Sequence, residues 1–151
     1  LQPSACVMAV DDAVVMVHVG DSRIYRLRGG RLLQLTVDHS GLNGLKRHGW
    51  PIPEDPAELQ RVTNAITQAL GWRYPLEPAL RTEPALPGDV LLLCSDGLSN
   101  VVSDSEIEAV LNRCTTLTES CDALVERAVA EGPPDDVTCL LLRWPERGAA
   151  T

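Results

Sequence analysis

The feature that most constrains the fold is an apolar run near the start of the chain that is interrupted once. Residues 13–19 are typical of a buried strand, residues 20–23 read Gly-Asp-Ser-Arg, and an alternating pattern resumes over residues 23–36. Gly29 and Gly30 supply the positive φ angles that a tight turn requires. An earlier apolar run is separated from residues 13–19 by two aspartates, which also favour a turn. The sequence therefore predicts two successive β-hairpins.

The rest of the chain predicts a surface excursion, two more strands and two helices. Residues 38–59 are rich in Gly, Pro and charge without a sustained period, which favours a long, partly helical excursion. Apolar runs at 90–94 and 137–144 predict buried strands. Ser103 and Thr116 each precede a glutamate by three residues, a pattern that predicts two helix starts. This order of elements favours an α+β domain with antiparallel sheet.

Composition narrows the class of protein. The chain has 151 residues, enough for one domain and marginal for two. Its formal net charge of −8 argues against binding nucleic acid through phosphate contacts. No apolar run approaches the length of a membrane span, so no membrane association is expected. The five cysteines form no C-x-x-C pair, which favours buried reduced thiols over zinc or disulfides, and hence a cytoplasmic protein.

Acidic residues recur where an apolar strand meets a turn. Asp21 and Asp96 each follow a strand, and Asp135 and Asp136 precede one. Taken singly, each is more simply a turn former or a helix cap. Taken together, they make a site for a hard divalent cation such as Mg²⁺ or Mn²⁺ a competing interpretation, because such ions prefer oxygen ligands. Spacing alone does not show that the three sites meet.

Four segments in order resemble the metal-dependent protein phosphatases (PPM, protein phosphatase 2C), bacterial branch. They are "VGDSRIYRLRGGRLLQLTVDHS", "NAITQALG", "GDVLLLCSDGLSN" and "PPDDVTCLLL". The resemblance implies a β-sandwich of antiparallel sheets flanked by helices, with a two-metal centre at one end. It makes residues 1–151 one partial phosphatase domain, with a flap insertion at 41–59 that contributes to substrate choice.

The resemblance also assigns metal ligands. Asp96 and Asp135 would be carboxylate ligands of the second metal, and Asp21 would help to hold a third, weaker one while anchoring the strand end. Asn100 stands where some members have a further Asp, and Asp136 replaces the usual Asn. The metals would be Mn²⁺ or Mg²⁺, two ions and possibly three.

Further residues are candidates beside this centre. Gly97 neighbours a metal-site aspartate. His39 follows Asp38 at a strand exit, where a hydrogen-bonded loop anchor is the main interpretation and a substrate contact the lesser one. Lys46, Arg47 and His48 lie in the expected flap, where solvated side chains are the simpler interpretation. Arg23 is expected to pair with a carboxylate and hold its loop.

The implied activity is hydrolysis of phosphoserine and phosphothreonine in proteins by a metal-activated water, with no protein nucleophile. Phosphoproteins would be the substrates and a serine/threonine kinase the counterpart. In this family an N-terminal segment, with an Asn-Glu-Asp-type stretch followed by Asp-Gly-x-Gly-Gly, supplies a bridging Asp, a carbonyl ligand and an upstream Arg for phosphate. That segment is not among these residues. A non-catalytic, phosphatase-like regulatory or binding module, or an inactive fragment, is therefore the alternative.

Overall fold

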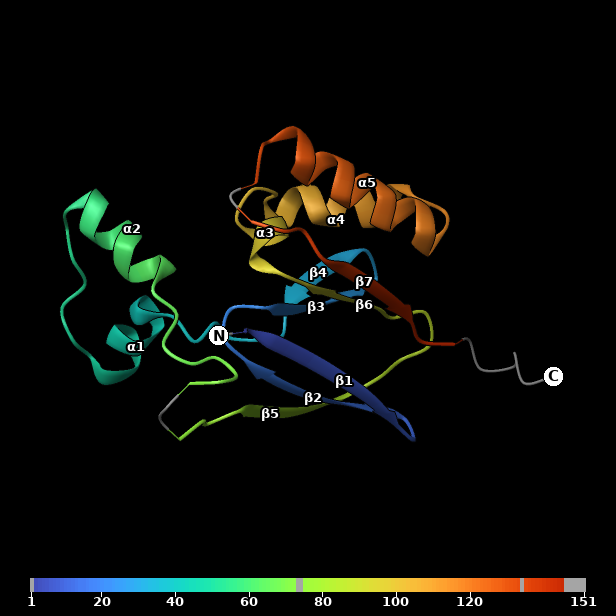
Figure 1. Cartoon of the computed structure of the whole chain (residues 1–151). Helices are drawn as coiled ribbons and strands as arrows, with labels where there is room; N and C mark the ends of the chain where they lie inside the picture. The colour runs from blue at the N-terminus through green and yellow to red at the C-terminus, as the bar shows by residue number, and fades with distance from the viewer. Residues whose placement is uncertain (1, 73–74, 134, 146–151) are drawn as a thin grey trace.

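Two antiparallel sheets stack face to face and one of them carries a layer of helices (Figure 1). The computed structural model describes residues 2–72, 75–133 and 135–145. One sheet has the order β1-β2-β5, with strands Ser4–Val10, Ala13–Val19 and Ala79–Pro84. The other has the order β4-β3-β6-β7, with strands Arg31–Gln34, Arg23–Arg28, Val90–Cys94 and Cys139–Arg143. The helices are α1 (Gly41–His48), α2 (Pro56–Asn64), α3 (Asp96–Ser99), α4 (Asp104–Arg113) and α5 (Leu117–Ala130).

Both predicted hairpins form, and their turns explain where they fold back. In the β1–β2 hairpin Val10 pairs with Ala13, and the first of the two turn residues between them, Asp11, has a φ of 50°. The β3–β4 turn uses Gly29 and Gly30, with φ angles of 55° and 78°. The hairpins belong to different sheets, so the chain crosses from one layer to the other at residues 20–22.

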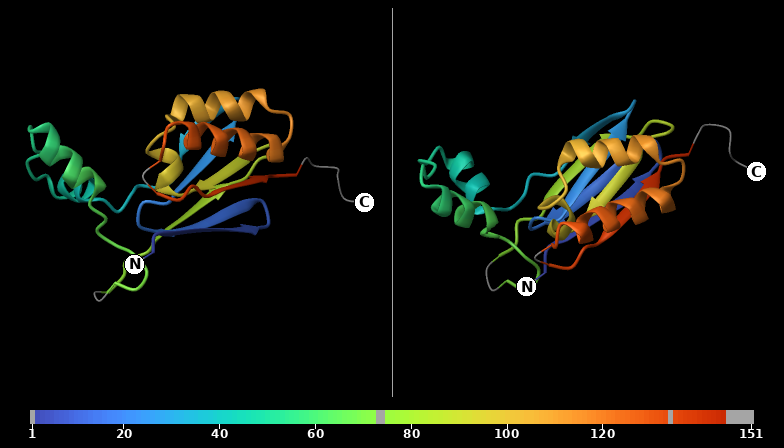
Figure 2. Two further views of the ribbon diagram at one scale, coloured as in Figure 1. Left: turned by 45° about the horizontal axis from the view of Figure 1, so that its top comes forward. Right: turned by 90° about the horizontal axis from the view of Figure 1, so that it is seen from above.

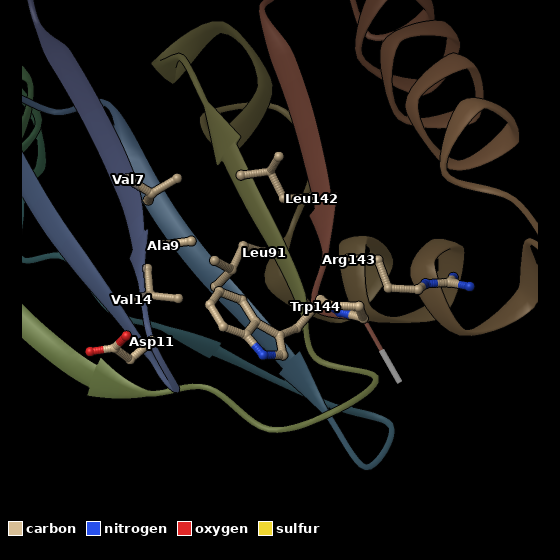
Figure 3. Close-up of a pocket in the computed structure, with 9 residues that line it drawn as sticks. Val7, Ala9, Asp11, Val14, Leu91, Leu142, Arg143 and Trp144 are labelled. Carbon is tan, nitrogen blue, oxygen red and sulfur yellow. The ribbon is translucent and has the colours of Figure 1, made fainter. Parts of the chain in front are cut away.

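The two sheets share an aliphatic interior, as a chain without Phe requires. Its buried members are Val14, Met16, Ile24, Leu35, Ala85 and Leu91. Between β1, β2, β6 and β7 this interior opens into a cavity of about 460 Å³, into whose space the indole of Trp144 projects (Figure 3). Apolar side chains dominate its walls, so it is a gap in the packing of the sandwich and has few groups for chemistry.

Helices α4 and α5 cover the outer face of the β4-β3-β6-β7 sheet (Figure 2). Ile107 from α4 and Leu124 from α5 are fully buried there against Tyr25 and Leu92 of the sheet. Both predicted helix starts are confirmed. Ser103 forms a complete capping box with Glu106, and the Thr116 hydroxyl accepts a hydrogen bond from the backbone of Glu119.

Several elements differ from the prediction, and the short helix α3 is not predicted at all. Strand β5 has no counterpart in it, because the prolines that surround residues 79–84 favour a loop. Strand β7 begins at Cys139 instead of Val137. The surface excursion is a pair of helices, α1 and α2, and it continues past the expected limit at residue 59 to Asn64.

The helix pair α1–α2 projects beside the sandwich and buries no residue (Figure 1). Backbone hydrogen bonds join the segment that enters α1 to the segment that leaves α2 and so form a short bridge. Gly41 donates its N–H to the carbonyl of Ala65, and Thr67 donates its N–H to the carbonyl of His39. In the described part of the chain, no helix is long and apolar enough to span a bilayer.

Candidate functional site

The strand β2 ends at a junction that needs glycine. Gly20 has a φ of 98°, and a Cβ there would lie 2.7 Å from the side chain of Pro3. Its N–H donates to Nδ1 of His39 at 3.3 Å, while its carbonyl accepts from the N–H of His39 at 2.8 Å. This double contact fixes the backbone from which Asp21 projects.

Asp21 is held in an electrostatically unfavourable position. Its Oδ1 atom is buried and has no hydrogen-bond partner in the described part of the chain. Burial raises the pKa of Asp21 above its ordinary value, and the nearby carboxylates of Asp96 and Asp38 raise it further. A cation beside this oxygen would relieve both the lost hydration and the repulsion.

Asp96 follows β6 and begins the short helix α3, beside the loop that carries Asp135. A Cβ on Gly97 would lie 2.4 Å from the carbonyl oxygen of Asp136, so only glycine allows this approach. The Ser95 hydroxyl donates to the same carbonyl at 3.0 Å and accepts from the N–H of Thr138 at 2.9 Å. Gly97 and Ser95 therefore hold the two acidic segments together.

The three predicted acidic sites line one continuous rim. Asp21, Asp96 and Asp135 all border a groove of about 690 Å³, and the same three border a smaller adjoining cavity of about 220 Å³. Asn100 donates from Nδ2 to Oδ2 of Asp96 at 3.3 Å, and Asp135 accepts from the backbone of Asp136 at 2.8 Å. The structure thus brings these five residues to one end of the sandwich.

Arg23 and Asp38 close one side of the smaller cavity. The Arg23 guanidinium donates to both oxygens of Asp38, the shortest contact being 2.7 Å, and also to the Tyr25 hydroxyl at 3.1 Å. The expected carboxylate pairing of Arg23 is confirmed. Because both oxygens of Asp38 accept hydrogen bonds from Arg23, the Asp38 carboxylate stabilises the loop and does not take part in the groove.

The other predicted residues lie apart from the acidic rim. His39 is buried, with 5% of its surface exposed, and its ring lies 4.7 Å from that of His18. Lys46, Arg47 and His48 form the exposed last turn of α1, where basic side chains suit the helix C-terminus. Thr63 and Asn64 of α2 line the smaller cavity instead, and no pattern in the sequence pointed to them.

The chemistry of the rim fits a hard divalent cation, since its side chains are oxygen donors and one oxygen is buried without a partner. Within residues 2–72, 75–133 and 135–145, however, no three His, Cys, Asp or Glu side chains are gathered closely enough to hold a metal ion. The described residues therefore do not by themselves form a complete coordination sphere.

Comparisons by sequence and by structure both find similarity to bacterial protein phosphatases. The sequence profile of the stage II sporulation protein E (SpoIIE) family matches residues 48–145. The protein phosphatase PhpP of Streptococcus pneumoniae is 38% identical over 140 residues, which is 93% of this chain and 56% of PhpP. The crystal structure of the Mycobacterium tuberculosis serine/threonine phosphatase PstP/Ppp superposes with a TM-score of 0.80 at 34% identity, covering 95% of this chain and 60% of that one.

A further structure connects this fold with metal. The catalytic domain of the serine/threonine phosphatase PstP, in complex with two manganese ions, is 35% identical with a TM-score of 0.73, covering 92% of this chain and 56% of that one. The chain spans between half and two thirds of the length of each of these relatives.

Proposed function

Because the chain belongs to the bacterial metal-dependent serine/threonine phosphatases (PPM, protein phosphatase 2C), we propose that its protein hydrolyses phosphoserine and phosphothreonine in other proteins. The observation that supports this most is the rim where Asp21, Asp96 and Asp135 border one groove, with Oδ1 of Asp21 buried and unpartnered. A groove lined by carboxylates repels a phosphate, so phosphate chemistry there requires a cation between the two.

Asp96 and Asp135 are the proposed ligands of one Mn²⁺ or Mg²⁺ ion, and Asp21 the proposed ligand of a further, weaker one. When bound, such an ion supplies Lewis acidity that makes water a better nucleophile and offsets charge on the phosphoryl oxygens. Asn100 orients the Asp96 carboxylate through its 3.3 Å contact. Gly97 and Ser95 set the position of the Asp135 loop. The remaining ligands belong to the upstream Asp-Gly-x-Gly-Gly segment that the family resemblance implies.

The helix pair α1–α2, which contains the expected flap, is the proposed substrate-facing element. Its α2 end lines the smaller cavity through Thr63 and Asn64, so it adjoins the acidic rim. The exposed Lys46, Arg47 and His48 at the end of α1 add basic character that suits a phosphorylated protein. A serine/threonine kinase as counterpart and a cytoplasmic location belong to the same proposal.

The test is release of phosphate from a phosphothreonine peptide, with Mn²⁺ and with chelator. It is run on the 151-residue chain and on a form extended upstream by a segment that carries Asp-Gly-x-Gly-Gly. We expect Mn²⁺-dependent turnover in the extended form and little or none in the shorter one, because the described residues contribute only part of a metal site. Absence of turnover from both forms would contradict the proposal.

A second candidate is a phosphatase-like binding module without turnover. The absence of a complete ligand cluster among the described residues favours it. The same assay separates the two candidates when phosphopeptide binding is measured alongside. Binding by the extended form without phosphate release would support the module, whereas turnover would exclude it.

A further inference from the structure

Three of the five cysteines gather where helix α5 meets the sheet, and the proposed phosphatase chemistry uses none of them. Cys94 lies on β6, Cys121 on α5 and Cys139 at the start of β7. Cys139 Sγ donates to Cys121 Sγ across 3.7 Å. Cys94 is the cross-strand neighbour of Cys139 but is 4% exposed, whereas Cys121 and Cys139 are both half-buried. This leaves one close pair of thiols with access to solvent.

We propose that Cys121 and Cys139 are a redox modification site, at which a hydroperoxide produces a reversible disulfide that ties α5 to β7. The two sulfur atoms are 3.7 Å apart, and a disulfide bond is about 2.05 Å long, so closure needs a movement of about 1.7 Å. Rotation about the Cα–Cβ bonds supplies movements of this size. The pair joins a helix to a strand, so the bond would lie across two packed layers.

The reaction balances with a hydroperoxide as the only oxidant. One thiol, as thiolate, attacks the peroxide oxygen, the O–O bond breaks, and a sulfenic acid and one water (or alcohol) form. The second thiol then attacks the sulfenic sulfur, the S–S bond forms, the S–O bond breaks and the sulfenic oxygen leaves as water. Two thiols lose two electrons and the peroxide gains them. Burial raises the pKa of the Cys139 thiol, so Cys139 is a poor first nucleophile.

The surroundings favour this pair over the other thiols. Cys6 is exposed on β1, in the sheet that does not contain β7, and Cys114 lies at the C-terminal cap of α4. Within the part of the chain that the structure describes, neither makes a hydrogen bond to another thiol. Cys94 belongs to the buried core, where a peroxide has little access.

The bond would act on the segment that carries the acidic rim. Cys139 follows Thr138, whose carbonyl accepts from the N–H of Ser95 at 3.1 Å and whose N–H donates to the Ser95 hydroxyl. The same hydroxyl holds the carbonyl of Asp136. Drawing Cys139 toward α5 therefore alters the strand end next to Asp135. Formation of the disulfide itself does not depend on the proposed phosphatase function.

The experiment treats the reduced 151-residue chain with hydrogen peroxide, blocks free thiols, and digests the protein with trypsin without reduction. Cleavage after arginine places Cys121 in the peptide 114–127 and Cys139 in the peptide 128–143. We expect these two peptides as one cross-linked species that dithiothreitol separates. Because Cys114 shares the first peptide, C114S is the matched control and should keep the cross-link, whereas C121S and C139S should each lose it.

The thermal midpoint of unfolding is a second readout, and it uses the unaltered chain in case a variant folds poorly. The disulfide closes a loop of about 20 residues, so oxidation should raise the thermal midpoint of the unaltered chain by several degrees or more and leave that of C121S unchanged. The proposal is overturned if the cross-link joins the peptide 82–113, which contains Cys94, if C114S abolishes it, or if no cross-link forms in folded protein whose thiols are reduced.

Discussion

The helix pairs α1–α2 and α4–α5 have the same kind of N-terminal cap, but they differ in how many side chains they bury. Helices α1 and α2 are capped by Ser40 and Asp55, just as α4 and α5 are capped by Ser103 and Thr116. Yet α4 and α5 bury apolar side chains against a sheet, while α1 and α2 bury none. The buried residues of α4 and α5 are Ile107, Val110, Leu111, Ser120, Leu124 and Ala128.

Capping thus decides where a helix begins, whereas burial decides how firmly it is held. The α1–α2 pair rests on its mutual contact and on the backbone bridge between residues 39–41 and 65–67. We therefore expect it to open at a smaller free energy than the α4–α5 layer, as segments with few buried contacts do. Such independence suits the substrate-facing role that is proposed for this element, which adjoins the acidic rim.

The largest effect is expected for Leu124→Ala. Leu124 is fully buried in α5, so its truncation leaves a cavity and should lower the free energy of unfolding by about 2–5 kcal/mol. Leu45→Ala, the same change in the half-buried setting of α1, should cost less than about 1 kcal/mol. Urea unfolding followed by circular dichroism measures both. Equal costs would contradict the difference between the two pairs.

A smaller, local effect is expected for Gly41→Ala. A Cβ at Gly41 would lie 2.8 Å from the carbonyl oxygen of Val62, so α1 and α2 must move apart, at a cost of about 1–3 kcal/mol. Gly44→Ala in the same helix meets no atom within 4 Å and should instead stabilise α1 slightly.

Hydrogen exchange distinguishes the two glycine variants. Amides of α2 should exchange faster in Gly41→Ala, and those of α5 should not change. If the amides of α5 also exchange faster, the α1–α2 pair is coupled to the core. The expectation that α1–α2 opens independently of α4–α5 would then be wrong.

A modest effect of pH is expected at the bridge itself. Burial lowers the pKa of His39 below its ordinary value of 6.5, and His18 and Arg47 lower it further, while Asp38 and Glu77 oppose the shift. Because the unfolded chain takes up the proton first, stability is fully present above pH 6.5 and decreases as the pH falls below that value. Protonation of Nδ1 would also remove the acceptor of the Gly20 N–H.

Unfolding measured between pH 7.5 and 5 checks this sign. Stability should decline in that range, and His39→Gln should flatten the decline. His48→Gln, at an exposed position, is the control and should leave the slope unchanged. A slope that His39→Gln does not alter would assign the effect to other groups.

Much of the fold follows from local patterns. Gly29-Gly30 and the capping residues Ser103 and Thr116 specify their structures through contacts within a few residues, and all three predictions are confirmed. Strand β5 could not be found in this way, since its pairing with β2 supplies what its sequence lacks. The joining of α1 and α2 likewise depends on the approach of Gly41 to Val62, which no local pattern encodes.

The candidate site shows the same limit. The sequence identified Asp21, Asp96 and Asp135 as chemically alike, but their meeting at one rim depends on sheet pairing and on the contact between Gly97 and the Asp136 carbonyl. The contribution of α2 to the adjoining cavity is a tertiary contact without a motif. The family resemblance implies that these aspartates lie at one centre, whereas their spacing in the sequence alone does not.

We propose that Asp96 belongs to a metal site at which phosphoproteins are hydrolysed, and the Asp96→Asn variant tests this proposal. Its matched control is Asp122→Asn, which removes the same charge from an exposed position on α5. In the extended form, Mn²⁺-dependent phosphate release from a phosphothreonine peptide should be abolished in Asp96→Asn and retained in Asp122→Asn, with both variants folded by circular dichroism. Full activity in a folded Asp96→Asn variant would contradict a metal-binding role for Asp96.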